Sequence, residues 1–251
     1  MVVLSGCGST PEDEFAAVSV DKLYADARDE AAEGNYEAAI KRYEKVEARA
    51  SGTLMAQQAQ LDVAYAYYKT GEKALALAKI ERFMRLNPSN PAVDYALYLQ
   101  GLINFNDDLG MFGWLSKQDL AERDQQASRD AYESFKQLVE RFPNSKYAPD
   151  ARLRMNHVVN SIAAGEVNIA RYYFKRGAYL AAANRAQYAV AEFKSSPAVE
   201  EALFIMAKSY GQLAMNDLRD DTMRVLTKNF PDSTFISQGF TTPTKPWWQP
   251  W

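Results

Sequence analysis

The 251-residue sequence contains a single cysteine, Cys7, and a single histidine, His157. A disulfide within one chain needs two thiols, and a structural zinc site usually needs four cysteine or histidine ligands. Acid–base and nucleophilic enzymes most often recruit histidine. Neither a Ser–His–Asp arrangement nor a His-Glu-x-x-His motif accompanies His157. The sequence therefore weighs against these classes of enzyme, and only carboxylate-based or cofactor-based catalysis stays compatible with it.

Charge of one sign and long apolar runs are also scarce. The 29 basic and 32 acidic residues nearly balance, and no basic stripe typical of nucleic-acid binders is present. No run approaches the roughly 18–20 apolar residues of a transmembrane helix. Only 12 glycines and 10 prolines occur, whereas alanine, the best helix former, occurs 38 times. The composition predicts an all-helical protein that binds neither nucleic acid nor a metal.

The first residues resemble a bacterial lipobox, Leu4-Ser5-Gly6-Cys7, in which cleavage precedes a lipid-modified cysteine. Only residues 1–4 stand where a charged region and an apolar stretch are expected. A buried free cysteine is the alternative, but the polar segment 8–14 offers nothing to bury it. We interpret residues 1–6 as a signal-peptide remnant and 7–20 as a flexible tether. An acyl lipid on Cys7 would hold the chain on a membrane without crossing it.

Three segments share a glycine between two helical patterns and an alanine five residues later. The pairs are Gly34 with Ala39, Gly71 with Ala76, and Gly177 with Ala182. They resemble tetratricopeptide (TPR) repeats, in which glycine makes the turn and small residues let paired helices approach. A fourth turn has Ala214 in place of glycine, as expected of a degenerate terminal repeat.

Counting about 34 residues per repeat predicts a right-handed superhelix of about five TPR-like helix pairs over residues 21–235. We divide it into N-terminal repeats, about 21–147, and C-terminal repeats, about 148–235. The clearest repeat has helices at about 56–70 and 73–86, and residues 148–176 form an unusually long helix. Residues 236–251 read as a flexible tail rich in proline and tryptophan. Its tryptophans have three candidate docking sites: the superhelix, a partner or lipid headgroups.

The first helices of stacked repeats line a concave groove. The groove candidates in repeats one and two are Tyr24, Arg28, Leu61, Tyr65 and Tyr68. Aromatic side chains beside a basic one suit an extended peptide or a C-terminal carboxylate. The alternative is that the tyrosines pack between helices and that Arg28 is a solvated charge.

A long apolar-rich loop, Asp107–Gln126, interrupts the third repeat. Long loops in compact domains are often functional, and exposed apolar clusters mark partner sites. The candidate partner residues are Phe112, Trp114 and Arg123. Folding of the loop onto the convex surface is the alternative.

The amino-acid sequences of several segments resemble those of the BamD (ComL-like) family of lipoproteins, which serve outer-membrane β-barrel assembly. The segments that carry the resemblance are 60–69, 80–88, 94–102, 141–147 and 171–185. The resemblance implies a protein lipid-anchored to the periplasmic face of the outer membrane. It also implies accessory lipoproteins and nascent outer-membrane proteins as partners, with the N-terminal repeats receiving the substrate's C-terminal signal strand. Residues 50–55 lack the aromatic and proline residues that some members have there.

The resemblance further implies that the C-terminal repeats bind a POTRA domain of the barrel-forming subunit. Arg185 matches an arginine of that contact region, so it is a candidate POTRA-binding residue; the alternative is an ordinary surface arginine. The predicted function is a non-catalytic, lipid-anchored scaffold for inserting β-barrel proteins. The alternative is a periplasmic TPR adaptor for cell-wall or envelope machinery.

Overall fold

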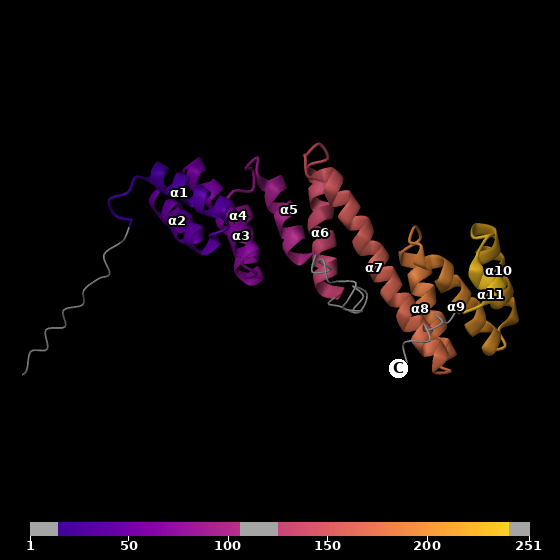
Figure 1. Cartoon of the computed structure of the whole chain (residues 1–251). Helices are drawn as coiled ribbons and strands as arrows, with labels where there is room; N and C mark the ends of the chain where they lie inside the picture. Colours follow the sequence, from indigo (N-terminus) through magenta and orange to yellow (C-terminus); the bar gives the residue numbers. More distant parts are fainter. Residues whose placement is uncertain (1–14, 106–124, 241–251) are drawn as a thin grey trace, which may run out of the picture. The chain divides into compact units, whose positions relative to one another are not determined.

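A computed structural model describes residues 15–105 and 125–240. All regular structure among these residues is α-helical, which confirms the predicted fold class (Figure 1). Cys7, Phe112, Trp114 and Arg123 lie outside the described residues. The helices are α1 (Val20–Glu33), α2 (Tyr36–Arg49), α3 (Leu54–Lys69), α4 (Lys73–Leu86), α5 (Val93–Asn104), α6 (Gln125–Arg141), α7 (Ala148–Lys175), α8 (Tyr179–Glu192), α9 (Ala198–Gln212), α10 (Asn216–Asn229) and α11 (Thr234–Gln238).

The helices form two units, each with its own core, and the division falls between Asn104 and Phe105. In unit 1, each of α1 to α4 packs on the next helix along the chain; in unit 2, each of α6 to α9 does the same. Helix α6 packs on the long helix α7, which groups it with the helices that follow. The division into N-terminal repeats, about 21–147, and C-terminal repeats, about 148–235, stays a prediction.

Three turns between paired helices adopt the left-handed backbone conformation that favours glycine. The φ angles are 88° at Gly34, 84° at Gly71 and 77° at Gly177. The alanines five residues later are each fully buried, as are Ala27, Ala64 and Ala170 on the preceding helices. These observations confirm that glycine makes the turns and that alanine lets the paired helices approach closely.

The fourth turn repeats this geometry without glycine. Ala214 has φ of 58° and is the only non-glycine residue with positive φ among the described residues. Its N–H donates to Gly211 O at 3.2 Å, and the next N–H donates to Tyr210 O at 2.9 Å. The turn at Gly34 makes the same two bonds. The repeat is therefore degenerate in residue type but not in backbone conformation.

Both ends of the helical region extend beyond the predicted limits. Arg49 Nη1 donates to Phe15 O at 3.1 Å and to Val18 O at 2.8 Å, and Ser19 caps α1. Residues 15–20 are thus bound to α2 and do not belong to a free tether. At the other end, α11 is followed by Phe240, whose ring centroid lies 5.0 Å from that of Phe204. The predicted flexible tail is wrong for residues 236–240.

Candidate polypeptide-binding surfaces

A half-buried polar cluster connects α1 to α3 in unit 1. The Tyr24 hydroxyl donates to Asp62 Oδ2 at 2.9 Å, and Gln58 Nε2 donates to Asp62 Oδ1 at 3.0 Å. The Tyr24 ring packs edge-on against Tyr43, with centroids 5.6 Å apart. The two helices are those that the repeat pattern assigns to the groove, so this cluster fixes one helix of the candidate surface against the next.

Burial controls the protonation of this cluster. It raises the pKa of the Tyr24 and Tyr43 phenols well above their usual range, and the nearby Asp62 charge adds to the effect. Burial also raises the pKa of the Asp62 carboxyl, although the hydrogen bonds from Tyr24 and Gln58 and the charge of Arg28 oppose this. Tyr24 therefore stays a neutral donor at physiological pH.

A group of tyrosine rings lies beside this cluster. The Tyr65 centroid is 6.4 Å from those of both Tyr36 and Tyr68, and Lys69 Nζ lies 5.9 Å from the Tyr36 centroid. Tyr65 is exposed, whereas Tyr36 and Tyr68 are half-buried. We call Tyr36, Tyr65, Tyr68 and Lys69 the tyrosine surface. It offers ring faces for stacking, hydroxyls for hydrogen bonding and one cation for a carboxylate.

The predicted groove residues differ in how far their side chains are exposed to solvent. Arg28 and Tyr65 are exposed, Tyr24 points to Asp62, and Tyr68 is half-buried. The assignment of Leu61 to the groove is wrong, because its side chain is only 1% exposed and lies in the core.

Sequence reasoning missed Tyr36, Gln58 and Asp62. The last two had a signal, because residues 58, 62, 65 and 69 recur with the spacing of one helix face. Polar side chains at three of these four positions marked that face as something other than core.

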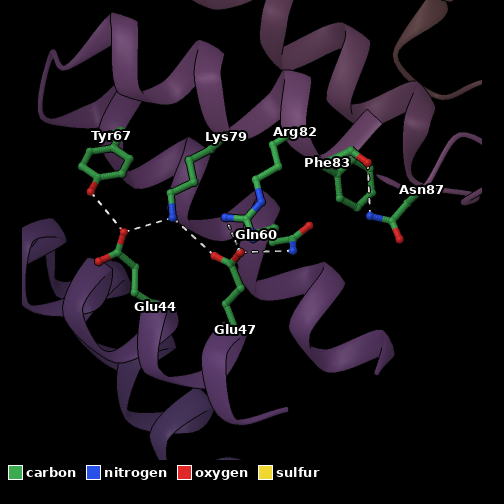
Figure 2. Close-up of polar contacts among 8 residues, drawn as sticks. All are labelled: Glu44, Glu47, Gln60, Tyr67, Lys79, Arg82, Phe83 and Asn87. Atoms are coloured by element: carbon green, nitrogen blue, oxygen red, sulfur yellow. Dashed lines mark hydrogen bonds and ion pairs between the residues drawn. The ribbon is translucent and has the colours of Figure 1, made fainter. Parts of the chain in front are cut away.

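An ion-pair network holds α3 between α2 and α4 (Figure 2). Glu47 accepts from Lys79 Nζ at 3.3 Å, from Arg82 Nη1 at 3.3 Å and from Gln60 Nε2 at 3.2 Å. Glu44 contacts Lys79 at 3.0 Å. Burial opposes the charge on Lys79, but the bonds and charges of the two glutamates raise its pKa overall. The network fixes the helix that carries most of the tyrosine surface.

In unit 2, Arg185 extends from α8 to a buried carboxylate on α7. Arg185 Nη1 lies 3.0 Å from Glu166 Oε2, and the side chains are 47% and 3% exposed respectively. An unpaired carboxylate at such depth costs several kcal/mol. Arg185 therefore compensates Glu166 and presents the rest of its guanidinium to solvent. The sequence did not reveal this partner, nineteen residues away on another helix.

A second ion pair lines a cavity of about 390 Å³ between α7 and α9. Arg171 binds both carboxylate oxygens of Glu201 at 2.6 Å and donates to Asn168 Oδ1 at 2.9 Å. Phe235 of α11 forms part of the cavity wall. The chain's own C-terminal segment thus occupies part of this surface.

The described residues show no grouping of three potential metal ligands among His, Cys, Asp and Glu. His157 is exposed, and its ring packs against Phe105 with centroids 5.7 Å apart. No helix in the described part of the chain combines the length and apolar character needed to span a membrane.

Stacked helix pairs joined by left-handed turns define a TPR-like helical protein. The chain belongs to the YfiO family of outer membrane lipoproteins, whose pattern matches residues 16–226. It is 50% identical over 233 residues to an outer membrane protein assembly factor BamD of Neisseria meningitidis serogroup B, covering 93% of this chain and 87% of the relative.

Similarity extends to a more distant relative, the assembly factor BamD of Vibrio cholerae, with 35% identity over 90% of this chain and 94% of that one. Among solved structures, the MamA protein aligns over 89% of this chain and 97% of its own, with 13% identity and a TM-score of 0.35.

Proposed function

We propose that this chain is an outer membrane protein assembly factor that works by binding polypeptides. The observation that carries this proposal is the 50% identity, over nearly the whole chain, to the outer membrane protein assembly factor BamD of Neisseria meningitidis. The tyrosine surface and the compensated Arg185 support a binding role, and no residue grouping in the described part of the chain supports catalysis. Loss of outer-membrane β-barrel proteins on depletion of the chain, and their recovery on complementation, tests the function.

The proposed attachment is a lipid on Cys7, which would place the chain on the periplasmic face of the outer membrane. Eight residue steps separate Cys7 from Phe15, which is bound to α2, so the tether reaches about 28 Å at most. Labelling of the full-length precursor with palmitate should be lost in Cys7→Ser. Equal labelling of both forms would exclude Cys7 as the acylated residue.

The tyrosine surface with Arg28 is the proposed site for the C-terminal segment of a nascent barrel protein. Aromatic side chains of such a segment would stack on Tyr65, and Lys69 or Arg28 would bind its carboxylate. Peptide binding measured by fluorescence anisotropy should weaken at least tenfold in Tyr65→Ala. The matched control is Tyr172→Ala, an exposed tyrosine of unit 2; equal weakening in both variants would contradict the assignment.

Arg185 is the proposed contact for a POTRA domain of the barrel-forming subunit. Its pairing with Glu166 complicates the obvious test, because Arg185→Glu places two carboxylates side by side and destabilises the helix pair. The double variant Arg185→Gln with Glu166→Gln removes both charges together. Glu166→Gln alone keeps Arg185 and serves as its control.

We expect only the double variant to lose POTRA binding in a pull-down, with both variants folded by circular dichroism. Binding by the double variant at wild-type affinity would reject Arg185 as a contact residue. The accessory lipoproteins remain proposed partners, with Phe112, Trp114 and Arg123 as their candidate residues. Co-purification of the wild-type chain with the barrel subunit separates this function from that of a cell-wall adaptor.

A further inference from the structure

A stretch of 25 residues without a single acidic side chain spans the turn between α7 and α8. Residues 167–191 contain no aspartate or glutamate but include Arg171, Lys175, Arg176 and Arg185. Asp and Glu make up 32 of the 251 residues, so three would be expected in a stretch of this length. Arg171 is paired with Glu201, and Arg185 is paired with Glu166. The other two cations of this stretch, Lys175 and Arg176, lie at the turn itself.

Exposed apolar side chains accompany these cations at the turn. Tyr172 is 55% exposed and Leu180 is 56% exposed. The Arg176 guanidinium lies over the Tyr172 ring at 5.4 Å, and Tyr173 packs edge-on against Tyr172 at 5.9 Å. The aromatic ring is therefore held outward with a cation across its face. We call Tyr172, Lys175, Arg176 and Leu180 the turn patch.

A helix C-terminus alone does not account for the turn patch. Cations in the last turn of α7 stabilise its dipole, which explains the charge but neither of the exposed apolar side chains. Acidic residues occur near the start of α10, where Asp220 is bound to Arg219 at 2.7 Å and Asp221 to Arg224 at 2.9 Å. Those pairs are internally compensated and leave the turn patch positive.

Aromatic and aliphatic side chains flanked by Lys and Arg are the combination found at the interface of a bilayer with water. The rings occupy the headgroup zone, while the cations bind anionic headgroups. We propose that the turn patch docks unit 2 on a membrane surface containing anionic lipid. This contact is additional to the proposed acyl anchor and independent of it.

The test uses the full chain carrying Cys7→Ser, so that no acyl group contributes. Sedimentation with phosphatidylcholine vesicles containing 30% phosphatidylglycerol is compared with sedimentation with pure phosphatidylcholine vesicles. We expect preferential binding to the anionic vesicles, lost in high salt. Lys175→Glu with Arg176→Glu should lower the partition coefficient at least about tenfold, since each cation contributes roughly 1 kcal/mol near such a surface. Leu180→Ser should weaken binding with no change of charge.

The matched control is Lys194→Glu with Lys228→Glu, which makes the same charge change at two exposed lysines elsewhere in unit 2. It should bind within about twofold of the parent chain. Equal loss in the control and patch variants, or equal binding of the parent to both vesicle types, would overturn the proposal. If the patch variant lost a protein partner while the parent chain bound no vesicles, the membrane proposal would be overturned and the turn patch would be a protein contact. If charge reversal unfolds the chain, Lys175→Gln with Arg176→Gln gives the same comparison.

Discussion

At the turns between paired helices, the hydrogen bonds of the neighbouring backbone hold one residue in the left-handed conformation. The bonds around Ala214 are those made around Gly34, so the backbone adopts the left-handed conformation even where a side chain opposes it. No atom lies within 4 Å of a Cβ built on Gly34, Gly71 or Gly177. The cost of a side chain at these turns is therefore one of backbone conformation and not of crowding.

Ala214→Gly should raise the free energy of unfolding by about 0.5–1 kcal/mol, because glycine adopts positive φ without strain. Gly177→Ala should lower it by about 1 kcal/mol for the same reason. Urea denaturation followed by circular dichroism measures both changes. A loss of stability in Ala214→Gly would show that the strain at this turn is relieved in some other way.

Asp62 should make stability depend on pH. Its pKa is raised in the folded state, so the folded protein binds more protons than the unfolded chain, and stability falls as pH rises from the unfolded pKa through the folded one. Asp62→Asn removes this dependence while keeping the size of the side chain. Relative to wild type, the variant should gain stability between pH 4 and pH 7 in thermal melts. A constant difference across that range would contradict the raised pKa.

At the scale of elements, ion pairs decide how the helices of unit 1 sit together. Glu47 is 12% exposed and accepts from three side chains of α3 and α4, whereas Glu44 is 43% exposed. Solvent screens the second glutamate, so the first should dominate. The contact of Glu47 with Gln60 should therefore be the one that fixes α3, the helix that carries most of the tyrosine surface.

Glu47→Ala should destabilise the protein by about 1–3 kcal/mol, since it removes the acceptor of the half-buried Gln60 amide and one of the two carboxylate partners of Lys79. Glu44→Ala should cost less than about 1 kcal/mol. Chemical denaturation of the two variants checks the ranking. We also expect peptide affinity at the tyrosine surface to fall in Glu47→Ala alone; equal effects of both changes would argue against a fixed α3.

At the scale of the whole chain, the sequence predicted the helices better than the limits of the folded part. The helix at 73–86 and the long helix from Ala148 follow from periodicity, glycine turns and proline stops, which are local signals. The packing of Phe240 on Phe204 and the binding of Phe15 by Arg49 depend on contacts between distant residues, and no local pattern reports them.

The candidate site was predictable to the same degree. Arg28 on α1 and Tyr65 on α3 were found because the repeat pattern assigns the first helix of each repeat to the groove, but Leu61 shares α3 with Tyr65 and turns inward. The partner relation of Arg185 with Glu166 depends on how α7 and α8 pack, which the sequence does not encode locally. Residue types therefore identified the surface, and packing determined which members are available to a ligand.

The aromatic docking of the C-terminal segment should be essential to unit 2. Phe240 contacts both Phe204 and Phe174, and Phe235 stacks on Phe204. Phe240→Ala should lower stability by about 2 kcal/mol, whereas Ile236→Ala, at an exposed side chain of α11, should cost less than about 1 kcal/mol. Differential scanning calorimetry compares the two; equal losses would show that the ring contacts of Phe240 contribute nothing special to unit 2.

The division at Asn104 and Phe105 separates two helices that a regular TPR array would pair. α5 belongs to unit 1 and α6 to unit 2, and the apolar clusters of each unit draw on its own helices. A substitution that opens a cavity in one of these clusters should therefore leave the apolar contacts of the other unit's clusters complete, and the two units should lose stability in separate steps.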